Sequence, residues 1–455
     1  MKLRPTPIRD LAVRTVPTQS LRANPANART HSKAQIEKIA ASIKTFGWMN
    51  PLIVDDGNRV LCGHGRLAAA KLLGMAKVPV IAIGDLTPEQ KRAYVLADNR
   101  LAELAGWDRP LVAIEIKELM ALDFDVGVIG FEPPAIDVML NDLDEQPEPE
   151  DPLPGLLRGA ATTKPGDVWI LGAHRLLCGD TTESASFTAL MAGHQAQLVI
   201  TDPPYNVRIA DISGLGKVKH REFAMASGEM SEERFVAFLE TVMAQLVKHT
   251  VGGSLHYIFM DWRHLYALLT AGRRRYTELK NLCVWAKSNG GMGSLYRSQH
   301  ELIAVFKNGA APHVNNVGLG KHGRNRSNVW PFAGVNGFRA GRDADLGDHP
   351  TVKPVAMIVE AIKDSSARGD IVLDCFAGTG TTILAAERTG RRAYAMEIDP
   401  LYVDVAIERW QAATGRDAVL QSTGETYDAL KAGLDGGIAE PEPKPKPNSK
   451  KGARR

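Results

Sequence analysis

Apolar runs alternate with helical patterns along the second half of the chain. Residues 198–200 and 371–373 contain only Leu, Val and Ile, the pattern of strands that are buried on both faces of a sheet. Residues 232–248 instead repeat apolar side chains at intervals of three and four, which predicts an amphipathic helix. We also expect strands at 253–260, 277–285, 301–307 and 392–396, and helices at 184–192 and 382–388. Strands that alternate with helices predict an α/β fold with a largely parallel sheet.

The first 140 residues predict a smaller α+β unit. Ser32 is a candidate helix cap, with Gln35 completing a capping-box pattern, and apolar residues follow at helical spacing until Gly47. We expect strands at 51–54, 60–62 and 78–83, and helices at 67–73 and 88–99. The turn between the first two strands is expected at 56–58, Asp-Gly-Asn.

An acidic, proline-rich segment separates the two parts. Residues 141–155 contain six acids, four prolines and no basic residue, a composition that cannot bury a core. The sequence therefore predicts a first domain at 1–140, a linker at 141–161, a second domain at 162–425 and a tail at 426–455. The end of that tail, 441–455, has six Lys or Arg and four Pro, which predicts a disordered basic segment or one that contacts phosphates.

The overall composition narrows the class of protein. The chain of 455 residues is 44% hydrophobic and 24% charged, as in water-soluble globular proteins. No stretch reaches the roughly 20 apolar residues of a membrane span, so no membrane partner is expected. Four cysteines at 62, 178, 283 and 375 form no Cys-x-x-Cys pair, which predicts neither a metal site nor disulfides but free thiols in the cytoplasm.

Two motifs follow the two buried strands. Asp202-Pro203-Pro204-Tyr205 ends the first run, and Asp374 leads into Phe376-Ala377-Gly378-Thr379-Gly380 after the second. Glycines at the start of a helix let the backbone approach a ligand, and ligands in parallel sheets bind beyond the carboxyl ends of the strands. The next strand ends in Glu397, whose carboxylate can accept both hydroxyls of a ribose. Asp399, before Pro400, is expected to cap a helix instead.

Together these motifs resemble those of the S-adenosylmethionine-dependent DNA amino-methyltransferases, over roughly residues 165–413. The order, with the catalytic motif first, resembles the β class. The resemblance implies a permuted Rossmann-like sheet, S-adenosyl-L-methionine as cofactor, double-stranded DNA as substrate and a homodimer. It also implies that Thr351 and Lys353 contact the carboxylate of the cofactor, Asp374 its amino group and Asp180 its adenine ring.

The residues of the catalytic motif suit the methylation of an exocyclic amine. Such an amine is a poor nucleophile because its lone pair is delocalised into the ring. Asp202 can accept one amine hydrogen and the carbonyl of Pro203 the other, while Pro204 holds that carbonyl rigidly. Tyr205 offers a flat face to an extruded base.

The motifs leave two candidates for the target base, adenine and cytosine, and they leave open whether the chain is active. Asp at the first motif position favours adenine, since many cytosine-directed relatives carry Ser there. The alternatives are the 4-amino group of cytosine and a catalytically inactive, DNA-binding regulator. Residues 312–347 are the candidate target-recognition loop, in which Arg324, Arg326, Arg339 and Arg342 are expected to contact phosphates or bases.

Residues 10–105 resemble the ParB/sulfiredoxin-like fold. The segment 46–54 and the turn Gly63-x-x-Arg66 carry this resemblance. His64 and Gly65 replace the Glu and Arg of the phosphate-binding turn of partition proteins, and no cysteine occupies the catalytic position of sulfiredoxins. A nucleotide at Gly63–Arg66, a structural turn and a DNA-contacting module without catalysis remain open. We expect a cytoplasmic protein that associates with the nucleoid through DNA.

Overall fold

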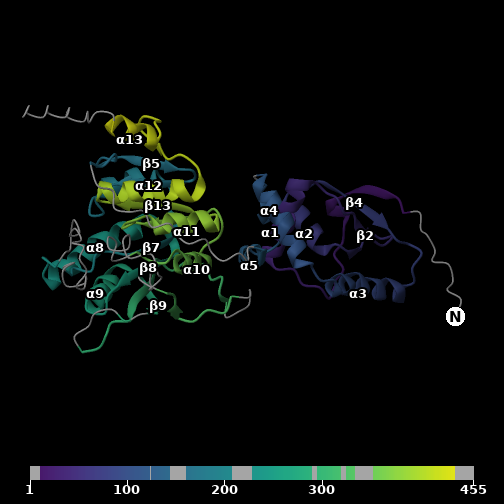
Figure 1. The fold of residues 1–455 in the computed structure, drawn as a ribbon. Helices are drawn as coiled ribbons and strands as arrows, with labels where there is room; N and C mark the ends of the chain where they lie inside the picture. The colour runs from purple at the N-terminus through teal and green to yellow at the C-terminus, as the bar shows by residue number, and fades with distance from the viewer. Residues whose placement is uncertain are drawn as a thin grey trace, which may run out of the picture. The chain divides into compact units, whose positions relative to one another are not determined.

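The computed structural model describes residues 11–122, 124–143, 160–207, 228–288, 290, 295–318, 324–333 and 352–435. The chain forms two compact units, Met1–Glu145 and Gln146–Arg455, which are considered one at a time (Figure 1). The predicted linker falls mostly outside the described residues, as do the tail from 436 onward, Thr351, Arg339 and Arg342.

The N-terminal unit contains a four-stranded sheet in the order β1-β4-β2-β3. Its strands are β1 (Val13–Pro17), β2 (Leu52–Val54), β3 (Val60–Cys62) and β4 (Lys77–Ala82), and only β2 and β4 pair in parallel. Its first three helices are α1 (Lys33–Phe46), α2 (His64–Leu72) and α3 (Pro88–Leu104). The small α+β architecture predicted for this region is therefore present.

Helix caps explain where these helices begin. Ser32 accepts a hydrogen bond from the Gln35 backbone, as predicted, but the side chain of Gln35 contacts the ring of His31. The complete capping box lies at α3, where Thr87 and Gln90 bond reciprocally. Helix α2 starts at His64, before the predicted position, because Gly63 at φ +98° turns the chain directly into the helix.

Two further helices, α4 (Arg109–Ala121) and α5 (Pro133–Leu143), were not predicted from the sequence. With the short 3-10 helix η2 (Val126–Ile129), they surround a small apolar cluster of their own that includes Ile116 and Ile136. Apolar residues lie all around α4, at 111–114, 116, 119 and 120, so its sequence has no distinct polar face. This explains why helical periodicity was not evident there.

The C-terminal unit is built on a ten-stranded sheet in the order β11-β9-β10-β8-β7-β12-β13-β6-β5-β14. The strands are β5 (Val168–Leu171), β6 (His174–Cys178), β7 (Ala196–Thr201), β8 (Thr250–Met260), β9 (Glu278–Ala286), β10 (His300–Lys307), β11 (Val329–Pro331), β12 (Ile371–Asp374), β13 (Arg392–Glu397) and β14 (Val419–Leu420). All neighbours from β8 to β6 pair in parallel, whereas β5, β10 and β14 pair antiparallel with their neighbours. The α/β prediction is confirmed.

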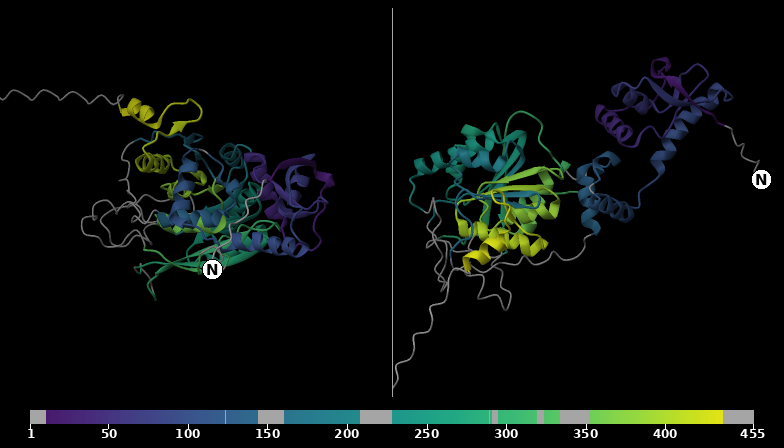
Figure 2. Two further views of the ribbon diagram at one scale, coloured as in Figure 1. Left: turned by 90° about the vertical axis from the view of Figure 1, so that its right-hand side faces the viewer. Right: turned by 90° about the horizontal axis from the view of Figure 1, so that it is seen from above.

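Helices cover both faces of this sheet (Figures 1 and 2). Helices α6 (Ser184–Met191), α8 (Glu232–Lys248) and α9 (Leu265–Arg275) contribute to one buried apolar cluster. Helices α10 (Val355–Ser365), α11 (Thr381–Thr389) and α12 (Pro400–Thr414) contribute to the other. Residues 427–435, which were expected to belong to a disordered tail at 426–455, instead form helix α13 (Tyr427–Asp435), because Tyr427 is buried in the same cluster. The sheet is thus buried on both sides, which explains the uninterrupted apolar runs of β7 and β12.

The four cysteines are free and buried. Within the described ranges, no group of three or more His, Cys, Asp or Glu side chains is arranged to hold a metal ion. No helix of that part of the chain combines the length and apolarity that crossing a membrane requires.

Candidate active site

Four neighbouring parallel strands bring the predicted site residues to one edge of the sheet. Strand β7, which leads into Asp202, pairs with β12. Strand β12 leads into Phe376–Gly380, which we call the glycine loop. Strand β12 pairs with β13, which ends at Glu397, and β13 pairs with β6, which leads to Asp180. Since parallel strands end on the same side, residues far apart in the sequence meet at this edge.

Asp374 links the catalytic strand to the glycine loop. Its Oδ1 accepts from the Thr201 hydroxyl at 2.8 Å and from the Phe376 backbone N–H at 3.1 Å, and its Oδ2 accepts from the Thr382 hydroxyl at 2.6 Å. Burial raises the pKa of Asp374 to about 6. Both oxygens of Asp374 therefore serve the protein itself, and its predicted contact with a cofactor amino group stays a prediction.

The glycine loop needs its glycines for two different reasons. Gly380 has φ +80°, and a Cβ there would lie 2.7 Å from Cβ of Ala406 on α12. Gly378 has φ +50°, but no atom would lie within 4 Å of its Cβ. Gly380 thus permits close packing of α12, whereas Gly378 borders open space that a ligand can fill.

Glu397 faces this loop from the end of β13. Its Oε2 accepts from the Gly378 N–H at 2.8 Å and its Oε1 from the Asp399 N–H at 3.0 Å. Burial raises the pKa of Glu397 to about 7. A carboxylate has about four acceptor positions, so Glu397 keeps capacity for the hydroxyls of a ligand beside Gly378. Asp399 caps α12 by accepting from the Leu401 N–H, as predicted.

The catalytic motif lies in a cluster of charges in which Lys353 is buried and the other groups are half-buried. Asp202 accepts from the Tyr205 hydroxyl at 2.6 Å through Oδ1, and its Oδ2 lies 2.5 Å from the Lys353 ammonium. Glu301, at the start of β10, accepts from the same Lys353 and the same Tyr205 hydroxyl, each at 3.0 Å through Oε2. Its Oε1 lies 2.5 Å from the Lys287 ammonium. Two carboxylates and two ammonium groups thus balance one another around Tyr205.

These contacts shift the pKa values of the cluster. Burial raises the pKa of Asp202, and Lys353 counteracts that rise. Burial alone would raise the pKa of Glu301 as well, but Lys353 and Lys287 hold it down to about 2. Burial disfavours the charge on Lys353, yet the two carboxylates raise its pKa above the ordinary value. Glu301 and Lys353 are therefore charged at neutral pH.

Lys353 is thus directed at Asp202 and Glu301 in this structure. Its predicted contact with the carboxylate of a cofactor stays a prediction. Glu301 and Lys287 were not singled out from the sequence as site residues. The available signal was the carboxylate of Glu301 just before the apolar residues 302–306 of β10, where a solvent-facing or paired position is required.

Asp180 lies in the turn between β6 and α6, where its Oδ1 accepts from the Thr182 N–H and hydroxyl, each at 2.7 Å. Gly179, just before it, donates its N–H to the Glu397 carbonyl at 2.9 Å. Asp180 is thus placed beside the strand that ends in Glu397, and its predicted role remains a prediction.

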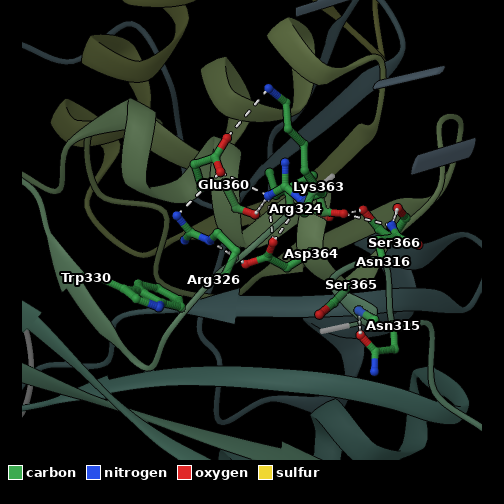
Figure 3. Close-up of polar contacts among 12 residues, drawn as sticks. Asn315, Asn316, Arg324, Arg326, Trp330, Glu360, Lys363, Asp364, Ser365 and Ser366 are labelled. Atoms are coloured by element: carbon green, nitrogen blue, oxygen red, sulfur yellow. Dashed lines mark hydrogen bonds and ion pairs between the residues drawn. The ribbon is translucent and has the colours of Figure 1, made fainter. Parts of the chain in front are cut away.

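Two of the four arginines expected to contact DNA bind the protein instead (Figure 3). Arg324 is 7% exposed and lies 2.6 Å from Asp364 and 3.0 Å from Glu360, both on α10. Arg326 lies 3.2 Å from Asp364 and 3.4 Å from Glu360. The prediction is therefore wrong for Arg324, which is buried against these carboxylates, whereas for Arg326, whose side chain is 20% exposed, contact with DNA stays a prediction.

The turn at Gly63–Arg66 is held by the protein as well. Arg66 donates to the Asn50 carbonyl at 2.5 Å and to the Pro51 carbonyl at 3.3 Å. His64 Nε2 accepts from the Asn24 N–H at 3.2 Å, and burial lowers the pKa of His64. These contacts favour a structural turn, and nucleotide binding there stays a prediction.

Comparison with known proteins assigns three regions to families. The family model for DNA methylases matches residues 196–408, which include the catalytic motif, the glycine loop and Glu397. The ParB N-terminal domain matches residues 5–100, and the ParB-methyltransferase helix-turn-helix domain matches residues 110–165, which include α5 and nearly all of α4.

Several curated proteins share these regions. Type II methyltransferase M.HpaI of Haemophilus parainfluenzae is 26% identical over 251 residues, 52% of this chain and 73% of that protein. DNA adenine methyltransferase YhdJ of Escherichia coli K12 is 26% identical over 249 residues, 48% of this chain and 76% of that protein. The ParB-like nuclease domain-containing protein YnaK of the same strain is 47% identical over 76 residues, 17% of this chain and 87% of that protein.

Among solved structures, the putative DNA modification methylase of Thermus thermophilus in complex with S-adenosyl-L-methionine aligns with a TM-score of 0.38 and 21% identity, covering 56% of this chain and 96% of that one. The cytosine-N4-specific PvuII DNA methyltransferase aligns with a TM-score of 0.41 and 15% identity, covering 57% of this chain and 91% of that one.

Proposed function

Because a DNA methylase family model matches residues 196–408 and the ParB N-terminal domain matches residues 5–100, we propose that the chain methylates the 6-amino group of an adenine flipped out of double-stranded DNA. The observation that carries the proposal is the position of Asp202 beside the glycine loop, at the shared edge of β7 and β12. An acceptor for an amine close to a site suited to a cofactor is the arrangement that such a transfer needs.

The residues present fit S-adenosyl-L-methionine, the methyl donor of this family. Gly378 borders open space, and the Glu397 carboxylate beside it suits the ribose hydroxyls. We assign Phe376–Gly380 and Asp180 to the same cofactor, with Thr351, Lys353 and Asp374 at its methionine end. When bound, the cofactor supplies an electrophilic methyl group on a sulfonium sulfur.

Asp202 and the carbonyl of Pro203 orient the amine. Each accepts one amine hydrogen, which directs the nitrogen lone pair toward the methyl group. The amine nitrogen would then take the methyl group that the bound cofactor supplies. The amine next gives up one proton, for which Asp202 is the nearest acceptor, and no covalent bond to the enzyme is required. Tyr205, whose hydroxyl is fixed by Asp202 and Glu301, stacks on the base.

Adenine is favoured by the Asp at the start of the catalytic motif and by the relative named as a DNA adenine methyltransferase. The 4-amino group of cytosine is the second candidate, since the same two acceptors suit either amine. The domain at 5–100 and the helices at 109–143 are proposed to contact DNA, in a cytoplasmic homodimer at the nucleoid.

The test is to express the chain in a host without DNA methylation and to map modified bases by long-read sequencing. Methylated adenine within one short motif is the expected result. Methylated 4-amino cytosine would retain the mechanism and change the base. Unmodified DNA, from soluble protein that binds the cofactor by calorimetry, would instead favour an inactive DNA-binding regulator.

The matched control is Asp202→Ala. It removes an acceptor for the amine and leaves Gly378 and Glu397 in place, so it should bind cofactor like the wild type and leave DNA unmodified. A variant that folds but has lost cofactor binding would show that the chemistry is misplaced.

A further inference from the structure

Lys353 holds Asp202 in an ion pair that competes with the proposed substrate. Its ammonium lies 2.5 Å from Oδ2 of Asp202, within the same carboxylate that must accept an amine hydrogen. A full positive charge attracts a carboxylate more strongly than a neutral amine does. When a base enters the site, the Asp202 carboxylate is therefore already bound to Lys353, a stronger donor than the amine.

Glu301 lies ready to take that donor. Its Oε2 is 3.0 Å from the Lys353 ammonium and 3.0 Å from the Tyr205 hydroxyl, so each donor to Asp202 already touches a second acceptor. Lys353 can therefore pass from one carboxylate to the other by a small shift, without losing a charged partner.

The position of Glu301 is rigid. It pairs with Trp285 across β9 and β10, and the adjoining Lys287 and Gln299 exchange further hydrogen bonds at 2.9 and 2.8 Å. Lys287 fixes the other oxygen of Glu301 at 2.5 Å. Asp202, in contrast, directly follows the last residue of β7. Glu301 is thus held within the sheet, whereas Asp202 lies just beyond the end of its strand.

Aromatic rings enclose the ammonium group. The Nζ atom of Lys353 is 5.2 Å from the ring centre of Phe259, 5.7 Å from that of Tyr205 and 5.9 Å from that of Trp285. Such rings stabilise a cation and exclude water from it. Lys353 is 7% exposed and therefore poorly hydrated, so a second carboxylate within reach stabilises it when Asp202 binds the amine.

We propose that Glu301 is a positioning residue for the methyl transfer: it receives Lys353 and the Tyr205 hydroxyl when the target amine binds Asp202. This inference rests on the proposed function. It makes Glu301 act through Lys353, so that the two residues are coupled, and it places neither of them in contact with the transferred methyl group.

The test compares Glu301→Gln, Lys353→Met and the double variant in single turnovers, with cofactor at concentrations shown by calorimetry to saturate each protein. Glu301→Gln should lower the rate constant about tenfold, with little change in DNA affinity, because Lys353 then stays on Asp202. Adding Lys353→Met should restore about threefold or more of this loss, because the competing ammonium is gone.

Glu278→Gln is the matched control. Glu278 also lies on the β9–β10 ladder and pairs with a lysine, Lys280, at 3.0 Å, but the pair is at the surface. This variant should retain the wild-type rate.

The pH profile separates this role from a purely structural one. The titratable groups that face Asp202 are Lys353, Glu301, Tyr205 and Asp374. The negative charge of Glu301 raises the pKa of Asp202, so Glu301→Gln should move the acidic limb of the rate profile to lower pH. A variant that merely loosened the packing would leave the limb in place.

Three results would overturn the proposal: a wild-type rate for Glu301→Gln, an unmoved acidic limb, or a double variant no faster than Glu301→Gln. If the wild-type protein methylates no DNA at all, the proposed function itself fails, and the role of Glu301 falls with it.

Discussion

Glu397 combines two tasks in one side chain. Its two oxygens hold backbone N–H groups of Gly378 and Asp399, which fixes the glycine loop, and its remaining lone pairs face the space beside Gly378. Burial raises the pKa of Glu397 from 4.5 to about 7. The same residue that shapes the loop therefore changes its charge near neutral pH.

Cofactor binding should consequently strengthen as the pH rises through about 7. The ionised carboxylate is the better acceptor for ribose hydroxyls, and protonation at lower pH removes part of that capacity. Calorimetric titration with S-adenosyl-L-methionine between about pH 6 and about pH 8 would measure the effect. Glu397→Gln should bind more weakly and without this pH dependence. A variant that keeps the wild-type profile would place the titrating group elsewhere.

The pKa of Glu397 also affects folding stability. Because the folded-state pKa lies above the unfolded one, the native protein binds more protons between pH 4.5 and about pH 7. The contribution of Glu397 to stability must therefore decrease as the pH rises through this interval. Urea unfolding at several pH values should show a shallower decline for Glu397→Gln than for the wild type.

Glycines at two positions of the same loop should respond differently to a methyl group. Gly380→Ala would press Cβ against Ala406 and should lower the free energy of unfolding by about 2 kcal/mol or more. Gly378→Ala meets no protein atom, so it should cost stability only through its backbone, about 1 kcal/mol, while weakening cofactor binding. Equal effects of both variants on stability and on binding would contradict this division.

At the scale of elements, polar contacts join the chain segment before β11 to helix α10 and the residue that follows it. Asn316 donates its side-chain N–H groups to the Lys363 and Ser366 carbonyls, at 2.7 and 2.8 Å. Arg324 and Arg326 then bind the carboxylates of the same helix, and β11 follows directly. The polar contacts in Figure 3 thus fix the path of the chain on both sides of residues 319–323.

Arg324→Ala should therefore destabilise the fold and leave DNA electrostatics unchanged. It leaves buried Asp364 paired with Arg326, at an expected cost of about 3 kcal/mol in the free energy of unfolding. The slope of DNA affinity against salt should remain that of the wild type, since no phosphate contact is removed. Arg273→Ala, an exposed position on α9, serves as the control for stability. If the slope of DNA affinity against salt is smaller by about one for Arg324→Ala, Arg324 contacts a DNA phosphate after all.

Sequence reasoning predicted elements well where one periodicity dominated. Helix α8 occupies the predicted residues, and strand β12 contains the predicted run. Helix α4 was missed because apolar residues lie all around it. The burial of Arg324 was missed because it depends on α10, which lies more than thirty residues later in the chain. Glu301 and Lys353 meet Asp202 only through tertiary structure, so no local pattern could reveal the cluster.

At the scale of the whole molecule, each unit has its own apolar core. The N-terminal core includes Leu52 and Val80, and the cores of the C-terminal unit lie on the two faces of its sheet. A chain that starts at residue 160 should therefore fold and bind the cofactor with wild-type affinity, while its DNA affinity falls. Thermal unfolding and calorimetry would measure both, with the full chain as control. Loss of cofactor binding by this fragment would make the two units interdependent.

The order of the strands also governs how the protein is made. Strands β12 and β13 lie between β7 and β6, although both are synthesised long after them. Before residues 371–397 have been synthesised, β7 and β6 lack the strands that pair with them on this side of the sheet. A nascent chain that stalls before this point would expose their unpaired edges to aggregation. The segment that carries the glycine loop is thus also the one that joins the halves, and a chain lacking it cannot become a partly active enzyme.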